Sequence, residues 1–111
     1  MWENRRHGAI DIVSGDKPLT VDTAESLRRI LAAHVQHGQP RLVMDFRQIP
    51  LIDSAGMELL LDTRDACVRR GGAFQLAALN PLCMDIVQLT GAAQYFEIFS
   101  DSVAAAGSFA Q

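Results

Sequence analysis

Residues 51–61, LIDSAGMELLL, place a polar Asp53-Ser54 pair and a glycine between two apolar runs. The preceding residues 41–46, RLVMDF, are a short, mostly apolar run of the kind found in a covered β-strand. The stretch therefore predicts a strand that leads, through a short link, into a helix that begins at Ser54. The inner face of this helix, which is expected to end near Arg70, is predicted to carry Met57, Leu60, Leu61 and Val68.

The flanking sequence alternates short apolar or β-branched runs with stretches of helical periodicity. Asp22, with Glu25 three residues later, predicts a capping box for the first helix. Asn80-Pro81 predicts the cap and first residue of the third helix, and Ser100 or Asp101 is expected to cap a short terminal helix. Such alternation indicates an α/β fold with largely parallel pairing and right-handed crossovers. The expected strands cover residues 9–13, 41–46, 73–79 and 96–99.

Length and composition restrict the classes of function. The chain has 111 residues, 49% hydrophobic and 21% charged, which suits one compact domain with a real core. A net charge of −3 and scattered arginines argue against nucleic acid as the main partner, because binding phosphates needs a basic face. The N-terminus has no apolar signal core, and no run approaches the roughly 20 apolar residues of a membrane span. We therefore expect a cytoplasmic protein with no membrane span.

Few residues could hold a metal or cofactor. His34 and His37 have i, i+3 spacing on the first predicted helix, but no third ligand is near, and surface histidines are the simpler interpretation. Cys67 and Cys83 stand apart and fit buried, reduced thiols. We expect neither a cofactor nor a metal.

Ser54 admits three interpretations. A nucleophile is disfavoured, because the Gly-x-Ser-x-Gly elbow is absent and all three histidines precede Ser54. A helix N-cap explains the residue fully and is worth roughly 1 kcal/mol. A phosphate on this serine would meet the favourable helix N-terminus, although Asp45 and Asp53 would repel it. Gly56 is expected to let a partner approach closely, and either Met57 or Leu59 to expose apolar area beside the serine.

The segment VMDFRQIPLIDSAGMELLL resembles the signature of the STAS domain, the fold of bacterial anti-sigma-factor antagonists. In that signature an apolar strand ends in Asp, and Asp-Ser-x-Gly then opens a helix. The segments PLTVDTAESLRRIL and RRGGAFQLAALNPLCMDIVQLTG also resemble the family. The resemblance implies a single STAS-like α/β domain over residues 1–111, with its core at about 9–103. It implies a mixed, mostly parallel sheet of four to five strands with about four helices.

The resemblance also implies a function. In such antagonists the serine after the motif Asp is phosphorylated by an anti-sigma factor that is itself a serine kinase, and a PP2C-type phosphatase removes the phosphate. The unmodified antagonist binds the anti-sigma factor and frees the sigma factor. By position, Ser54 matches the phosphorylated residue, and we expect Asp53, Ala55, Gly56, Met57 and Leu59 to form the partner-binding surface of a non-enzymatic, monomeric or weakly dimeric switch.

The sequence departs from the family pattern in three places. Ala55 replaces a common second hydroxyl, and Lys17-Pro18-Leu19-Thr20 lacks the usual Gly and Asp. Residues 1–6 are too short for a full additional edge strand and are expected to form at most a stub. Two other roles of this domain stay open. One is a partner subunit of an ABC-type phospholipid transport system, and the other is a stressosome-type scaffold.

Overall fold

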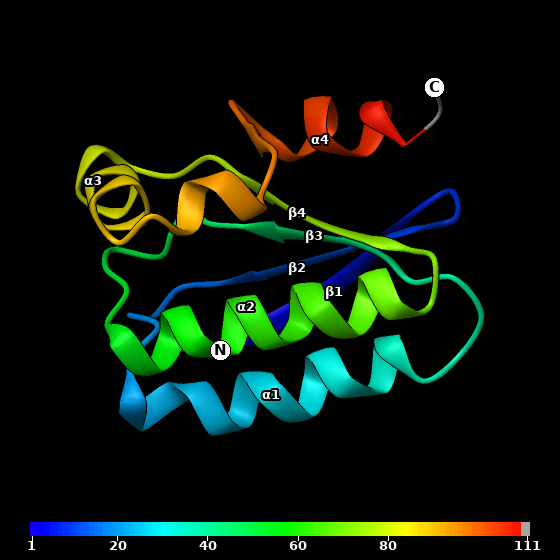
Figure 1. The fold of residues 1–111 in the computed structure, drawn as a ribbon, viewed down its shortest axis with the longest axis horizontal. Helices are drawn as coiled ribbons and strands as arrows, with labels where there is room; N and C mark the ends of the chain where they lie inside the picture. The colour runs from blue at the N-terminus through cyan, green and yellow to red at the C-terminus, as the bar shows by residue number, and fades with distance from the viewer. Residues whose placement is uncertain (110–111) are drawn as a thin grey trace.

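The computed structural model describes residues 1–109 and contains one five-stranded sheet with helices on both faces (Figure 1). The strands are β1 (Trp2–His7), β2 (Ile10–Gly15), β3 (Arg41–Asp45), β4 (Ala73–Ala77) and β5 (Ile98–Phe99). The helices are α1 (Val21–Val35), α2 (Ser54–Arg69), α3 (Pro81–Leu89) and α4 (Ser102–Ser108), with a short 3₁₀ turn η1 (Ala92–Tyr95). The predicted α/β class, the mostly parallel sheet and the number of helices are confirmed.

The strands lie in the sheet in their chain order, β1 to β5. β1 and β2 form an antiparallel hairpin, whereas β2, β3, β4 and β5 are all parallel. Figure 1 shows α1 and α2 side by side on one face, α4 on the other, and α3 beside the start of α2. The carboxyl ends of the parallel strands therefore point toward the edge where α1, α2 and α3 begin.

Hydrophobic burial is unequal on the two faces. The larger cluster lies under α1, α2 and α3 and includes Leu27, Leu60 and Met44, all essentially inaccessible to solvent. The smaller cluster lies under α4, where Ile12 and Val43 of the sheet meet Ala105 and Ala106. The face with α1 and α2 thus supplies most of the hydrophobic stabilisation.

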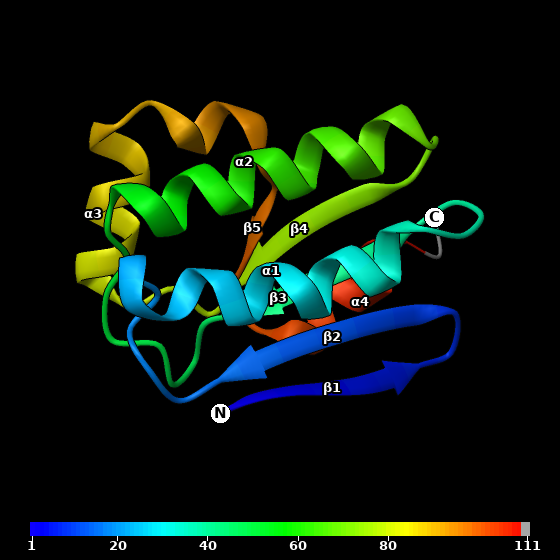
Figure 2. The same cartoon turned by 90° about the horizontal axis from the view of Figure 1, so that it is seen from below.

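The N-terminal segment is a full strand and not a stub, so that expectation was wrong. All six residues of β1 pair with β2, from Trp2 opposite Gly15 to His7 opposite Ile10 (Figure 2). Five of these six residues are exposed, so β1 lacks the apolar pattern by which sequence reasoning finds a strand. Its backbone pairing and the packing of Trp2 against the larger cluster hold it in place.

Three further local predictions need correction. Helix α1 begins at Val21, one residue before Asp22. Its capping box is formed by Thr20 and Thr23, whose side chains accept hydrogen bonds from each other's backbone N–H groups. Val68 is 47% exposed, and Thr63 and Cys67 are buried in its place. The last strand covers only Ile98–Phe99. By contrast, Asn80 caps α3 and Asp101 caps α4, as predicted.

Candidate functional site at the start of helix α2

The link between β3 and α2 crosses the carboxyl edge of the sheet and is anchored from within. Ile49 and Ile52 are buried in the larger cluster, whereas Leu51 between them remains 37% exposed. The backbone is also tied to residue Leu19: the Leu19 N–H donates to the Leu51 carbonyl at 2.9 Å, and the Asp53 N–H donates to the Leu19 carbonyl at 3.0 Å. The link therefore presents α2 in a fixed orientation.

Asp53, not Ser54, is the N-cap of α2. One carboxylate oxygen accepts the Gly56 N–H at 2.9 Å, and the other accepts the Val21 N–H at 2.8 Å. Hydrogen bonds from Gly56 first, and then from Val21, lower the pKa of Asp53 below its ordinary value. One carboxylate thus joins the N-termini of α1 and α2, two segments 32 residues apart.

Ser54 is the first residue of α2 and is exposed. Among residues 1–109, no hydrogen bond involves its hydroxyl, so the prediction that this hydroxyl caps the helix was wrong by one position. Because Asp53 already satisfies the cap, the Ser54 hydroxyl contributes nothing visible to the fold. It is an exposed primary alcohol at the start of α2.

Gly56 serves internal packing. The residue is buried, and a Cβ placed there would lie 2.4 Å from the Leu19 carbonyl oxygen and 2.7 Å from the Leu19 Cγ. Such contacts are far inside van der Waals distance. Glycine is therefore required so that the segment before α1 can pass against the first turn of α2. The expected role of Gly56 in partner approach stays a prediction.

Met57 and Leu59 are both buried, with 6% and 1% exposure, so the expectation that one of them exposes apolar area was wrong. The reason is that α2 packs against the sheet on one side and against α1 and η1 on others, which buries a wide arc of its surface. Ala55 is half-buried next to the serine. Neither Met57 nor Leu59 offers contact area to a partner in this structure.

Sequence reasoning missed the apolar side chains that do lie at this edge. Val21, at the start of α1, is 69% exposed, and Leu82, in the first turn of α3, is 53% exposed. Asn80 holds the start of α3 beside the link, because its side-chain amide donates to the Pro50 carbonyl at 3.1 Å. With Leu51, these residues are exposed apolar side chains of the segments that meet at this edge of the sheet. An apolar residue in the first turn after a helix cap is the signal that could have identified Val21 and Leu82.

Asp45, at the end of β3, is not an open negative charge facing the serine. It is 8% exposed, accepts the Arg47 N–H at 2.9 Å, and lies 3.8 Å from the Arg5 guanidinium. Because Arg5 offsets its charge, we retain only Asp53 as a source of repulsion toward a phosphate at Ser54.

The other candidate groups do not gather into a site. His34 is only 20% exposed at its side chain and lies 3.4 Å from the Asp11 carboxylate, whereas His37 is exposed. Cys67 and Cys83 are free and buried, and burial raises the pKa of Cys67 to about 11. In the described part of the chain, no three His, Cys, Asp or Glu side chains are grouped to hold a metal ion. Within residues 1–109, no helix has the length and apolar character needed to cross a bilayer.

The fold and the exposed serine of an Asp-Ser-x-Gly helix start define a STAS domain, and comparison with known proteins agrees. The sequence profile of the STAS domain matches residues 1–106, and the chain belongs to this family. BtrV of Bordetella bronchiseptica, provisionally named an anti-sigma factor antagonist, is 30% identical over 86 residues, covering 78% of this chain and 74% of BtrV.

Solved structures show the same fold at low sequence identity. A Thermotoga maritima protein, also provisionally described as an anti-sigma factor antagonist, superposes with a TM-score of 0.93 at 15% identity, covering 99% of this chain and 95% of that one. The phosphorylated form of the Bacillus cell fate determinant SpoIIAA gives a TM-score of 0.72 at 15% identity, with coverage of 94% and 96%. These likenesses confirm the predicted fold, and the profile match and BtrV confirm the predicted family.

Proposed function

We propose that this chain is an anti-sigma-factor antagonist whose binding to an anti-sigma factor is controlled by phosphorylation of Ser54. The observation that carries the proposal is the exposed Ser54 hydroxyl, which has no structural task because Asp53 already caps α2. The provisional name of BtrV and the phosphorylated form of SpoIIAA support the same assignment. In this proposal the chain is a cytoplasmic substrate and binding partner, and not an enzyme.

The chemistry belongs to the partners. An anti-sigma factor with serine kinase activity supplies ATP and the catalytic base, and the Ser54 oxygen attacks the γ-phosphorus as ADP leaves and the hydroxyl proton passes to the base. A PP2C-type phosphatase returns the free hydroxyl by hydrolysis. This chain contributes the substrate serine and the exposed apolar residues at the same edge of the sheet.

The position of Asp53 explains how the phosphate would weaken the complex. A phosphoserine carries about −1.5 to −2 charge at pH 7. Helix N-termini usually receive such a charge, but here the Gly56 N–H is already bound to the Asp53 carboxylate. The added charge would therefore be repelled by Asp53, at an edge of the sheet that also exposes Val21, Leu51 and Leu82. Burying it there against an apolar partner surface is unfavourable.

A paired capture experiment tests the proposal. Wild type, Ser54→Ala and Ser54→Asp are used as baits in extract of the native cells, and bound proteins are identified by mass spectrometry. Ser100→Asp is the matched control, because Ser100 is also exposed but lies just before α4, the helix on the opposite face of the sheet from α2 (Figure 1). We expect a small ATP-binding kinase on wild type, Ser54→Ala and Ser100→Asp, and its loss from Ser54→Asp.

Two outcomes would contradict the switch. Equal affinity of Ser54→Ala and Ser54→Asp for a purified partner kinase would show that charge at this position does not control binding. Capture of an ABC transporter ATPase by all four baits would favour the transport-partner role instead, and Ser54 would then be only the first residue of a helix.

A further inference from the structure

A groove of about 270 Å³ lies between α1 and α2, away from the start of α2 where Ser54 lies. Its floor is apolar, because Leu31 and Leu59 are buried beneath it and Val35 and Ala66 are partly buried at its sides. Apart from Ala32, the rest of its lining is polar or charged and comprises Arg28, Gln36, Asp62, Thr63 and Arg70. The groove exists because small side chains, Ala32 and Ala66, stand where two adjacent helices would usually fill the space with larger ones.

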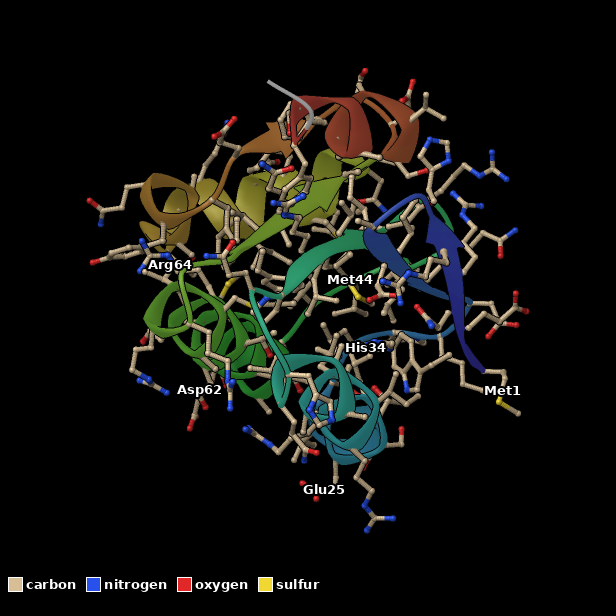
Figure 3. All side chains as sticks on the ribbon, turned by 90° about the vertical axis from the view of Figure 1, so that its right-hand side faces the viewer. Met1, Glu25, His34, Met44, Asp62 and Arg64 are labelled. Carbon is tan, nitrogen blue, oxygen red and sulfur yellow. The ribbon has the colours of Figure 1, made fainter. Side chains whose placement is uncertain are left out.

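Charged residues close the groove at two points along the helices. Near the middle of both helices, Arg28 of α1 pairs with Asp62 of α2 across the groove at 3.5 Å. Figure 3, which looks along the helices, shows Asp62 at the outer surface of α2. At the far end, Arg70 lines the groove at the C-terminal end of α2, and no carboxylate among residues 1–109 pairs with it. The two arginines therefore differ, since only Arg70 is free to take an anion.

We propose that this groove binds a medium-chain aliphatic carboxylate, with the chain between α1 and α2 and the carboxylate on Arg70. Asp62 and Arg70 are eight residues apart on α2, or about 12 Å at 1.5 Å per residue, which sets the length available to an extended ligand. The volume is near the lower end of the range of small-molecule sites, about 300 Å³. It suits one short acyl chain and is too small for a two-chain lipid.

The site is independent of the proposed switch, although both use α2. Ser54 is the first residue of the helix and Arg70 follows its last residue, so the two sites lie at opposite ends. Failure of the phosphorylation proposal would therefore leave this inference standing, and the reverse is also true.

Titration of the full chain with octanoate, followed by backbone amide NMR, tests the inference. We expect saturable shifts confined to the groove-lining parts of α1 and α2, and weaker binding of octanol, which lacks the charge. Arg70→Gln should weaken octanoate binding about threefold to fivefold, the range of an exposed ion pair, and should leave octanol unaffected. Arg69→Gln is the matched control, because Arg69 is the neighbouring exposed arginine but does not line the groove.

A second variant tests the apolar part separately. Ala66→Phe places an aromatic ring in the groove and should abolish the binding of both compounds while the protein remains folded, which its amide spectrum reports. The inference is overturned if wild type shows no saturable shifts, if Arg69→Gln and Arg70→Gln weaken octanoate equally, or if a folded Ala66→Phe binds as wild type does.

Discussion

Two helices of this protein begin with the same dipeptide, Asp-Ser, and the two serines have opposite fates. In α2 the Asp53 carboxylate caps the helix and Ser54 is exposed with a free hydroxyl. In α4 Asp101 caps the helix by accepting the Ala104 N–H at 2.7 Å, but Ser102 is 6% exposed and accepts a hydrogen bond from Arg5 at 2.6 Å. The dipeptide therefore specifies a helix start, and the surroundings decide whether its serine is available for modification.

The largest difference in stability between the two helices is expected when their glycines are substituted. Gly56→Ala forces a methyl group against the Leu19 carbonyl, whereas at Gly107 in α4 an added Cβ meets nothing within 4 Å. We expect Gly56→Ala to lower the free energy of unfolding by about 2 kcal/mol. Gly107→Ala should be neutral or stabilising by up to about 1 kcal/mol. Urea unfolding of both variants measures the difference, and equal effects would show that α2 can move away from Leu19.

The next largest difference in stability is expected between variants of the two capping aspartates. Asp101→Ala removes one backbone hydrogen bond and should cost about 1 kcal/mol. Asp53→Ala removes two, to Gly56 and to Val21, and should cost about twice as much, because the link between α1 and α2 is lost with the cap. Thermal unfolding compares them. A smaller loss for Asp53→Ala than for Asp101→Ala would mean that the bond to Val21 adds nothing.

Acid should reduce the stability that the Asp53 carboxylate contributes. Because hydrogen bonds lower the folded-state pKa of Asp53, its contribution to stability is fully present above the ordinary value of 3.8 and is lost as the pH falls through the folded-state value. The stability gap between wild type and Asp53→Asn should therefore shrink as the pH falls from about 6 to about 3. Urea midpoints at several pH values measure it, and a gap that is constant or grows toward acid would contradict the assignment.

The serines themselves should give the smallest effects. Ser102→Ala removes the hydrogen bond from Arg5 and should cost about 1 kcal/mol, whereas Ser54→Ala should stay within about 0.5 kcal/mol of wild type. Phosphorylation by a purified partner kinase should modify Ser54 and leave Ser102 untouched. Detection of phosphate at Ser102 in the folded protein would show that exposure does not govern the choice.

Much of this arrangement could be predicted from the sequence, because the strongest local signals agree with the fold. The alternation of runs, the Asn80-Pro81 cap and the Asp-Ser-x-Gly motif gave the α/β class, the start of α3 and the family. The single-residue error at Asp53 arose because aspartate and serine are both good caps, and only the backbone shows which residue precedes the first turn.

The remaining errors concern contacts between distant segments. β1 is a strand only because β2 pairs with it, and its exposed sequence gives no periodic signal. Met57 and Leu59 are both buried because α2 has neighbours on several sides, which a single-helix pattern does not show. Gly56 faces Leu19 from a segment far away in the sequence. Local patterns thus located the serine, whereas tertiary packing decided what surrounds it.

The polar character of β1 also protects the protein from self-association through its sheet. β1 forms one border of the sheet with Glu3, Arg5 and Arg6 exposed along it, and the opposite border, β5, is only two residues long. Charged or very short borders are poor templates for strand addition by another chain. The feature that concealed β1 from sequence analysis is therefore the one that discourages growth of the sheet into aggregates.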